Sequence, residues 1–479
     1  MALVSCFLPR SRYFQRLLRS PWSLAIIARS SSTVVKTSGD SKVLPFSNIP
    51  GPKGTIQNVL EYVLNKGSRL DVVKKRFEIF GPIYIEQVLG TQFVNISDAD
   101  AVAKVLHTEK KFQMRPGFDS LNEILDRNKG LMLLSNDYDK WYPERSLLSP
   151  KLLRPKDINE KFPMLNTVAN DFVKQLNLRT TQCDGKVENI EEEVTFFSVE
   201  ALASYMFEQR LGFYNHPPDL TVVAFVDAAT KVANSIGELA INSPFDKYIK
   251  TPAYYRAEKN VTTFCAIGMS VYDKILATNQ EQEKDSSQKE SLFDYASKNM
   301  AKISGLLAGA IDTTSATSIW LLYLLSQHPD IQDKLYQQLI TAVGPDGEVS
   351  ASNLPSLLKA ALKESQRMYP VAGYVVPRVF DRDLDVLGYH IPSGVNIIMH
   401  EYVMSLDKRY YGENAKEFVP ERWLRDETGK RQELNAFVSL PFGYGTRMCI
   451  GRRIAEAMIY MLISKILLSY RLEYAGENE

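Results

Sequence analysis

The chain has 479 residues, of which 45% are hydrophobic and 10% aromatic, and its formal net charge is +1. This composition supplies enough apolar material for a large buried core. The four cysteines (Cys6, Cys183, Cys265 and Cys449) show no paired spacing, which argues against a disulfide scaffold or a Cys-rich zinc site and favours a reducing compartment.

The first 39 residues contain no Asp or Glu but carry five arginines among frequent Ser and Leu. This composition is typical of a mitochondrial presequence, whereas the scattered arginines disagree with the apolar centre of a secretory signal. The longest apolar run, at 22–28, is too short to span a bilayer. We expect a presequence at 1–35 and a linker at 36–48. Losing the five arginines would change the net charge from +1 to −4, which leaves no overall basic field for nucleic acid.

The folded domain is expected to begin at the Ile-Pro-Gly-Pro-Lys segment 49–53, because its prolines are incompatible with a helix. Apolar segments at 83–85 and 93–96, with Gly90 between them, predict a β-hairpin. From about 136 to 323 the apolar spacing of three and four residues predicts helices. The polar run at 279–290 predicts a solvated loop.

After Lys363, prolines divide the chain into short pieces, including strand-like segments at 373–379 and 395–399. The segment 453–470 returns to a helical pattern. The pattern predicts a mainly α (α+β) fold, with one domain over 49–479 and small sheets at one side. The chain ends soon after its last helix.

The segment 442–451 contains Cys449 within a glycine-rich turn. Gly443 and Gly445 allow a tight turn next to a flat cofactor, and Gly451 allows close approach where a helix begins. Backbone N–H groups at that helix start can donate to a thiolate. A lone cysteine with such neighbours is more often structural, so a cofactor-binding role for Cys449 requires the complete pattern of the segment.

That pattern, Phe-x-x-Gly-x-Arg-x-Cys-x-Gly, resembles the cysteine signature of the cytochrome P450 family. The resemblance implies the P450 fold, haem b as cofactor, Cys449 as axial ligand of the iron, and dioxygen-dependent monooxygenase activity. It also implies that Phe442 shields the sulfur and that Arg447 pairs with a haem propionate.

Glu364 and Arg367 are three residues apart in a helix expected to start near Leu354 and to end before Pro370. Alone, such a pair is usually a solvated surface contact. Resemblance to the family implies that both join Arg422 in a buried structural cluster that braces the haem-binding region. In the segment 418–423, tryptophan stands where the family usually has phenylalanine.

Gly309 and Thr313 share one face of a long apolar helix, expected over about 292–327. The threonine hydroxyl can bond the carbonyl one turn back and bend the helix. Viewed alone, this is a Thr-rich core helix. Resemblance to the oxygen-activating helix of the family implies that Thr313 and Asp312 are catalytic, with Asp312 relaying protons. Ala310 stands where many members have glycine.

Trp141 and Arg145 resemble a family pattern, Trp-x-x-x-Arg, whose polar groups reach a haem propionate. Because proline is tolerated only in a first helical turn, Pro143 indicates either that this helix starts late or that Trp141 is not the family's tryptophan. Arg378 is a further propionate candidate by its position in the family pattern.

Lys359 and Lys363 lie one turn apart on the helix of Glu364, and their stripe is rotated by about a hundred degrees from the Glu364–Arg367 face. Arg452 and Arg453 follow the cysteine directly. These charges look like the ferredoxin-docking surface of the mitochondrial branch, whose members take electrons from a ferredoxin and its NADPH-dependent reductase. The alternative is that they only aid solubility.

The resemblance further implies a largely apolar pocket lined by 113–134, 220–241, 306–310 and 371–376, which suits a lipophilic substrate. Mitochondrial relatives commonly hydroxylate sterols, steroids or secosteroids. The segment 240–252 is expected to contact the inner membrane from the matrix side without spanning it.

Two other readings remain open. One is a haem-thiolate isomerase or peroxide-dependent enzyme that needs no reductase, although Asp312, Thr313 and the basic residues argue against it. The other is a haem- or lipid-binding protein that is inactive, because the chain ends earlier than relatives of the family usually do.

Overall fold

A computed structural model describes residues 2–6, 43–52, 54, 58, 61, 69–88, 90–130, 132–215, 219–246, 249–279, 300–344, 348–372 and 375–475. The expected presequence, apart from 2–6, lies outside these residues, as does the expected loop beyond residue 279. Within the described part, no helix is both long and apolar enough to cross a bilayer.

Most of the described residues are helical. The α-helices are α3 (Arg69–Phe80), α4 (Ala99–His107), α5 (Asp119–Arg127), α6 (Tyr138–Leu153), α7 (Pro155–Asn159), α8 (Phe162–Gln182), α9 (Ile190–Phe207), α10 (Leu220–Asp246), α11 (Pro252–Asn279), α13 (Met300–Gln327), α14 (Pro329–Val343), α15 (Ser356–Met368), α16 (Glu401–Ser405), α17 (Lys408–Tyr411) and α18 (Arg452–Ser469). Short 3-10 turns occur at Phe46–Asn48, Pro420–Trp423 and Gly445–Arg447.

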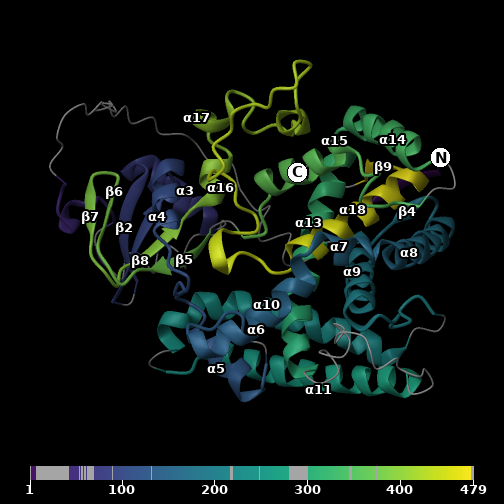
Figure 1. Cartoon of the computed structure of the whole chain (residues 1–479), viewed down its shortest axis with the longest axis horizontal. Helices are drawn as coiled ribbons and strands as arrows, with labels where there is room; N and C mark the ends of the chain where they lie inside the picture. The colour runs from purple at the N-terminus through teal and green to yellow at the C-terminus, as the bar shows by residue number, and fades with distance from the viewer. Residues whose placement is uncertain are drawn as a thin grey trace.

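The strands form three small sheets. They are β1 (Ala2–Cys6), β2 (Ile83–Val88), β3 (Thr91–Ile96), β4 (Lys186–Val187), β5 (Val375–Val379), β6 (Leu384–Val386), β7 (Tyr389–Ile391), β8 (Asn396–Met399) and β9 (Tyr470–Tyr474). Their orders are β4-β1-β9, β2-β3-β8-β5 and β6-β7. The predicted hairpin is confirmed, since β2 and β3 pair antiparallel from Ile83 opposite Ile96 to Val88 opposite Thr91. Figure 1 shows the four-stranded sheet beside α3 and α4, to the left of the helical body.

Helix α13 runs through the helical body and packs against α9, α10, α11 and α18 (Figure 1). Its apolar side chains, such as Leu321 and Leu325, are fully buried. Its hydroxyls are satisfied within the helix, because Ser315 and Ser318 donate to carbonyls four residues earlier at 2.7 and 2.9 Å. The predicted class, a mainly helical fold with small sheets at one side, is confirmed.

Proline 143 lies inside α6, which begins at Tyr138 after the capping residue Asp137. The alternative that this helix starts late is therefore wrong. Proline removes the bond that would reach the carbonyl of Asp139, and both residues are exposed, so water can satisfy that carbonyl.

Candidate haem-thiolate site

A cavity of about 410 Å³ lies between α13 and the Cys449 segment. Its lining includes Cys449 and Phe442 on one side and Gly309 and Thr313 on the other. The segments expected to line a pocket do so, through residues such as Leu121, Leu134, Ile236, Leu306 and Val371. The sequence interpretation missed α11, which adds Val261, Phe264 and Cys265.

The Cys449 side chain is exposed, but it faces this cavity inside the protein rather than the outer surface. The turn before it depends on Gly443 and Gly445, whose φ angles are 71° and 72°. The Cys449 N–H donates to the Phe442 carbonyl at 2.8 Å, which closes the loop. Gly451 then caps the N-terminus of α18.

Burial raises the pKa of the Cys449 thiol, and four groups oppose that shift. Backbone N–H groups of Gly451 and Arg452 hydrogen-bond the sulfur, and the charges of Arg145 and Arg115 attract its anionic form. A metal ion bound to the sulfur would lower the pKa of this thiol much further, because a thiolate bound to a metal is deprotonated outright.

Across the cavity, the Thr313 hydroxyl donates to the Gly309 carbonyl at 2.9 Å, as the spacing predicts. A Cβ placed on Gly309 would meet no atom outside its own helix within 4 Å, so open space lies beside this turn. Asp312 does not line the cavity. It is half-buried, and burial raises the pKa of its carboxyl.

Arg115, Arg145 and Arg447 line the cavity and Arg378 lies next to them, and among the described residues Glu109 is the acid whose charge acts on this group. Arg378 is fully buried and its Nε donates to Glu109. Arg447 donates to the carbonyls of Gln113, Leu133 and Ser135. Its guanidinium also lies 4.4 Å from the centre of the Trp141 ring. Trp141 and Arg145 both line the cavity.

The fourth arginine, Arg115, was not singled out in the sequence. Its pKa is lowered well below the usual value, first by burial and then by the charges of Arg378 and Arg447. Among the described residues, its buried Nε has no hydrogen-bond partner. Burial, followed by the charges of Arg378 and Arg145, also lowers the pKa of Arg447, to about 10. The site thus lacks negative charge, and the two propionates of a haem would supply it.

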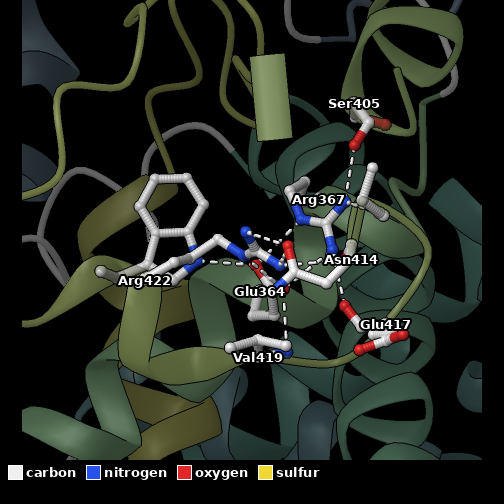
Figure 2. A network of polar contacts seen from close by, with 9 residues as sticks. Glu364, Arg367, Ser405, Asn414, Glu417, Val419 and Arg422 are labelled. Atoms are coloured by element: carbon white, nitrogen blue, oxygen red, sulfur yellow. Dashed lines mark hydrogen bonds and ion pairs between the residues drawn. The ribbon is translucent and has the colours of Figure 1, made fainter. Parts of the chain in front are cut away.

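The predicted charged cluster, composed of Glu364, Arg367 and Arg422, is present and buried (Figure 2). Arg367 contacts both oxygens of Glu364, at 2.9 and 2.8 Å, and Arg422 Nε contacts Oε1 at 2.9 Å. Arg367 also donates to the carbonyls of Ser405, Ala415 and Glu417. The indole N–H of Trp423 donates to Glu364 at 2.8 Å, a bond that the usual phenylalanine could not make.

The lysines expected to point outward, Lys359 and Lys363, are exposed. Burial, then the charges of Arg431 and Arg452, lower the pKa of Lys363. Arg452 forms an ion pair with Glu456 at 3.1 Å, and Arg453 is exposed. We call Lys359, Lys363, Arg431, Arg452 and Arg453 the basic surface. The sequence did not predict Arg431 as part of this surface, because it is distant in sequence from the other four residues.

A thiol that faces a cavity, opposite a Thr-containing helix turn and beside Arg115, Arg145 and Arg447, defines a haem-thiolate class of site. The profile of the cytochrome P450 family matches residues 49–479, and the chain therefore belongs to the cytochrome P450 family. It is an oxidoreductase of the P450 monooxygenase type, and its cofactor is haem, iron protoporphyrin IX.

Curated relatives match over most of the chain. Cytochrome P450 27C1 of Aquarana catesbeiana is 30% identical, covering 91% of this chain and 83% of the relative. Cholesterol side-chain cleavage enzyme, mitochondrial, of Ovis aries is 29% identical, covering 90% and 84%. Sterol 26-hydroxylase, mitochondrial, of Homo sapiens is 28% identical, covering 83% and 78%.

Proposed function

We propose that this monooxygenase hydroxylates a sterol- or steroid-like substrate in mitochondria, with electrons from a ferredoxin and its NADPH-dependent reductase. The observation that carries the proposal is the cavity, because a single apolar space reaches both Cys449 and Thr313. A lipophilic molecule in that space could present a C–H bond between the cofactor site and the oxygen-binding turn.

For the cofactor, we propose that Cys449 would hold the haem iron through its thiolate, and that Arg145, Arg378, Arg447 and Trp141 would bind the propionates. Phe442, Gly443 and Gly451 would shape the sulfur's surroundings. To these we add Arg115, because its buried Nε and lowered pKa support an anionic partner. When bound, haem supplies an iron that activates dioxygen for insertion of one oxygen atom into substrate.

For catalysis, we propose that Thr313 holds a water or a proton at its hydroxyl next to the open space at Gly309. The bond to the Gly309 carbonyl fixes the position of this hydroxyl. Asp312 would exchange protons with solvent from behind the helix. The raised pKa of its carboxyl, which results from burial, supports that role because such a group holds a proton more readily.

The substrate class rests on the relatives and on the cavity. The names of two relatives state cholesterol and sterol as the molecules they act on. In this chain, side chains such as Leu125, Val232, Val261, Phe264 and Val371 offer an apolar lining of the kind a ring system needs.

For electron delivery, we propose the basic surface as the ferredoxin-docking site. The lowered pKa of Lys363, caused partly by two neighbouring arginines, supports a local excess of positive charge. An acidic partner would be attracted and oriented by that charge. The surface includes Arg452, whose N–H bonds the sulfur, so this side of the protein is also close to the cysteine.

For location, we propose the matrix side of the inner mitochondrial membrane, with a presequence at 1–35, a linker at 36–48 and a single monooxygenase domain from residue 49. The acid-free N-terminus and the mitochondrial names of two relatives support this. A peripheral membrane contact near α10 and α11 is supported by Ile249 and Tyr255, which are 77% and 59% exposed.

A spectral titration with a sterol and steroid panel, followed by turnover of each ligand, tests this function. We expect some panel members to shift the iron from low to high spin and to yield product with ferredoxin, its reductase and NADPH. Product with peroxide alone would instead favour the reductase-independent reading. Spin shifts without any product would favour the inactive binding protein.

A further inference from the structure

Helix α16 carries a buried acid that belongs to neither arginine cluster. Glu401 is the first residue of this helix and is 2% exposed. Its Oε1 accepts the backbone N–H of Leu440 and the hydroxyl of Ser439, the latter at 3.2 Å. Ser439 and Leu440 lead directly into the Cys449 loop, so one carboxyl group anchors the entrance of that loop.

The anchor continues through backbone bonds to the cysteine. The carbonyl of Leu440 accepts the N–H of Gly443 at 2.7 Å, and the carbonyl of Phe442 accepts the N–H of Cys449 at 2.8 Å. Each bond fixes the next turn of the loop. Movement of Leu440 would therefore be transmitted to the backbone that holds the sulfur.

The other end of α16 is tied to the Glu364 cluster, because Arg367 donates to the carbonyl of Ser405 at 2.6 Å. The residue before the helix, His400, is fixed as well, since its N–H bonds the Ile96 carbonyl and its Nε2 lies 2.7 Å from the Asn95 amide oxygen. Glu401 thus projects from a helix that is held at both ends.

We propose that Glu401 is a positioning residue that sets the geometry and the solvent protection of the Cys449 loop from the far end of α16. The proposal rests on the proposed role of Cys449 as the iron ligand. The carboxyl group suits this task because two convergent donors fix it, and an apolar side chain would leave the Leu440 N–H unpaired in a buried place. Burial raises the pKa of Glu401 to about 8, so the group need not carry a charge to accept these bonds.

The test compares Glu401→Leu, Glu401→Gln and wild type as haem-loaded proteins. One readout is amide hydrogen exchange over 439–449, and the other is the rate at which the reduced CO complex loses its thiolate-type band. Glu401→Leu should exchange the Leu440 and Gly443 amides about tenfold faster and lose the band several-fold faster. Glu401→Gln should stay close to wild type, because its amide oxygen can accept both bonds.

Glu200→Leu is the control, since Glu200 is also fully buried and accepts the backbone N–H groups of Gly212 and Phe213, in a loop distant in sequence from Cys449. Glu200 also pairs with Arg210 at 2.6 Å, so this variant should lose at least as much stability as Glu401→Leu. It should lower the melting temperature without a selective effect on 439–449. Equal effects of Glu401→Leu and Glu200→Leu on the loop would overturn the proposal.

If Glu401→Leu does not accumulate, Ser439→Ala removes one of the two donors and decides the question. Faster exchange at Leu440 supports the proposal, and unchanged exchange overturns it. A wild-type protein that shows no thiolate-type band at all would instead refute the role of Cys449, so the two failures are distinguishable.

Discussion

Two of the places where the protein buries arginines differ in how completely the charges are matched. In the Glu364 cluster, Arg367 and Arg422 share one carboxylate and fill their remaining donors with backbone carbonyls (Figure 2). At the cavity, Arg115, Arg145, Arg378 and Arg447 lie near one another, and in the described part of the chain Glu109 is the acid whose charge acts on Arg115, Arg378 and Arg447. A satisfied cluster stabilises the fold, whereas an incomplete one indicates where an anionic ligand binds.

The largest expected effect comes from breaking the satisfied cluster. Arg367→Met leaves the fully buried Glu364 without its bidentate partner and three carbonyls without a donor. We expect the free energy of unfolding to fall by about 3–5 kcal/mol, or folding to fail. Urea unfolding of the haem-free protein measures this. A loss below about 1 kcal/mol would mean that the cluster does not stabilise the fold.

A buried acid, Glu401, also has no cation among the described groups that shift its pKa. Burial raises the pKa of Glu401 from 4.5 to about 8. Between these values the folded state holds a proton that the unfolded chain has lost, so stability falls as pH rises from about 5 to about 8. Glu401→Gln lacks this proton exchange, so its stability relative to wild type should rise over that range. Unfolding curves at several pH values check this, and a constant difference would contradict it.

At the cavity, Arg145→Met should have opposite effects on the two forms of the protein. Without haem, removing a buried cation whose pKa is lowered by burial should leave the stability unchanged or higher. Haem affinity should fall by about 10-fold to 100-fold, because a charge-assisted bond to a propionate is lost. Haem titration of the haem-free protein measures the affinity, and urea unfolding of the same protein measures the stability. Unchanged affinity would show that Arg145 does not contact the cofactor.

Thr313→Ala removes the hydroxyl that faces the cavity and spares the helix, since alanine is a good helix former. We expect product formed per dioxygen consumed to fall about tenfold, with haem binding unchanged. Parallel measurement of oxygen uptake and product tests this. Thr341→Ala on α14, whose hydroxyl also bonds its own helix, is the control.

The smallest effect is expected at the basic surface. Lys363→Glu should raise the KM for ferredoxin several-fold, with a smaller difference at high salt, because exposed charges act mainly through screened attraction. Lys259→Glu should change little, because this exposed lysine is on α11, a helix at the bottom of Figure 1, whereas α15, which carries Lys363, is near the top. Equal KM changes in both variants would remove the basis for this docking site.

The sequence predicted what local spacing determines. Thr313 with Gly309, and Glu364 with Arg367, lie within one helical turn, and both contacts are present. Spacing alone could not predict contacts between distant segments, and the contact of Arg422 with Glu364 was expected only from the family resemblance. The Arg115 guanidinium donates to the carbonyl of Arg447, which is 332 residues away, and no local pattern records that pairing.

Pro143 suggested a late start for α6, but the helix begins at Tyr138. Proline disfavours a helix interior because it lacks an N–H and because its ring clashes with the carbonyl four residues earlier. Here that carbonyl, of Asp139, lies on an exposed turn, where the helix can bend and water can bond the carbonyl. Cys265 and Phe264 were missed as cavity residues because a helical pattern does not reveal which neighbouring helix, or which empty space, its apolar face meets. The role of Glu401 at the Cys449 loop could not be recognised from the sequence either, since acidic residues are common at the start of helices.

The central claim is that the incomplete site holds a haem whose iron is bound by Cys449. The absorption spectrum of the reduced, CO-bound protein tests it most directly, with Cys449→Ser measured alongside. The account predicts a thiolate-type band in the wild type and none in the variant. A wild-type protein that binds haem but lacks this band, or a variant that keeps it, would contradict the account.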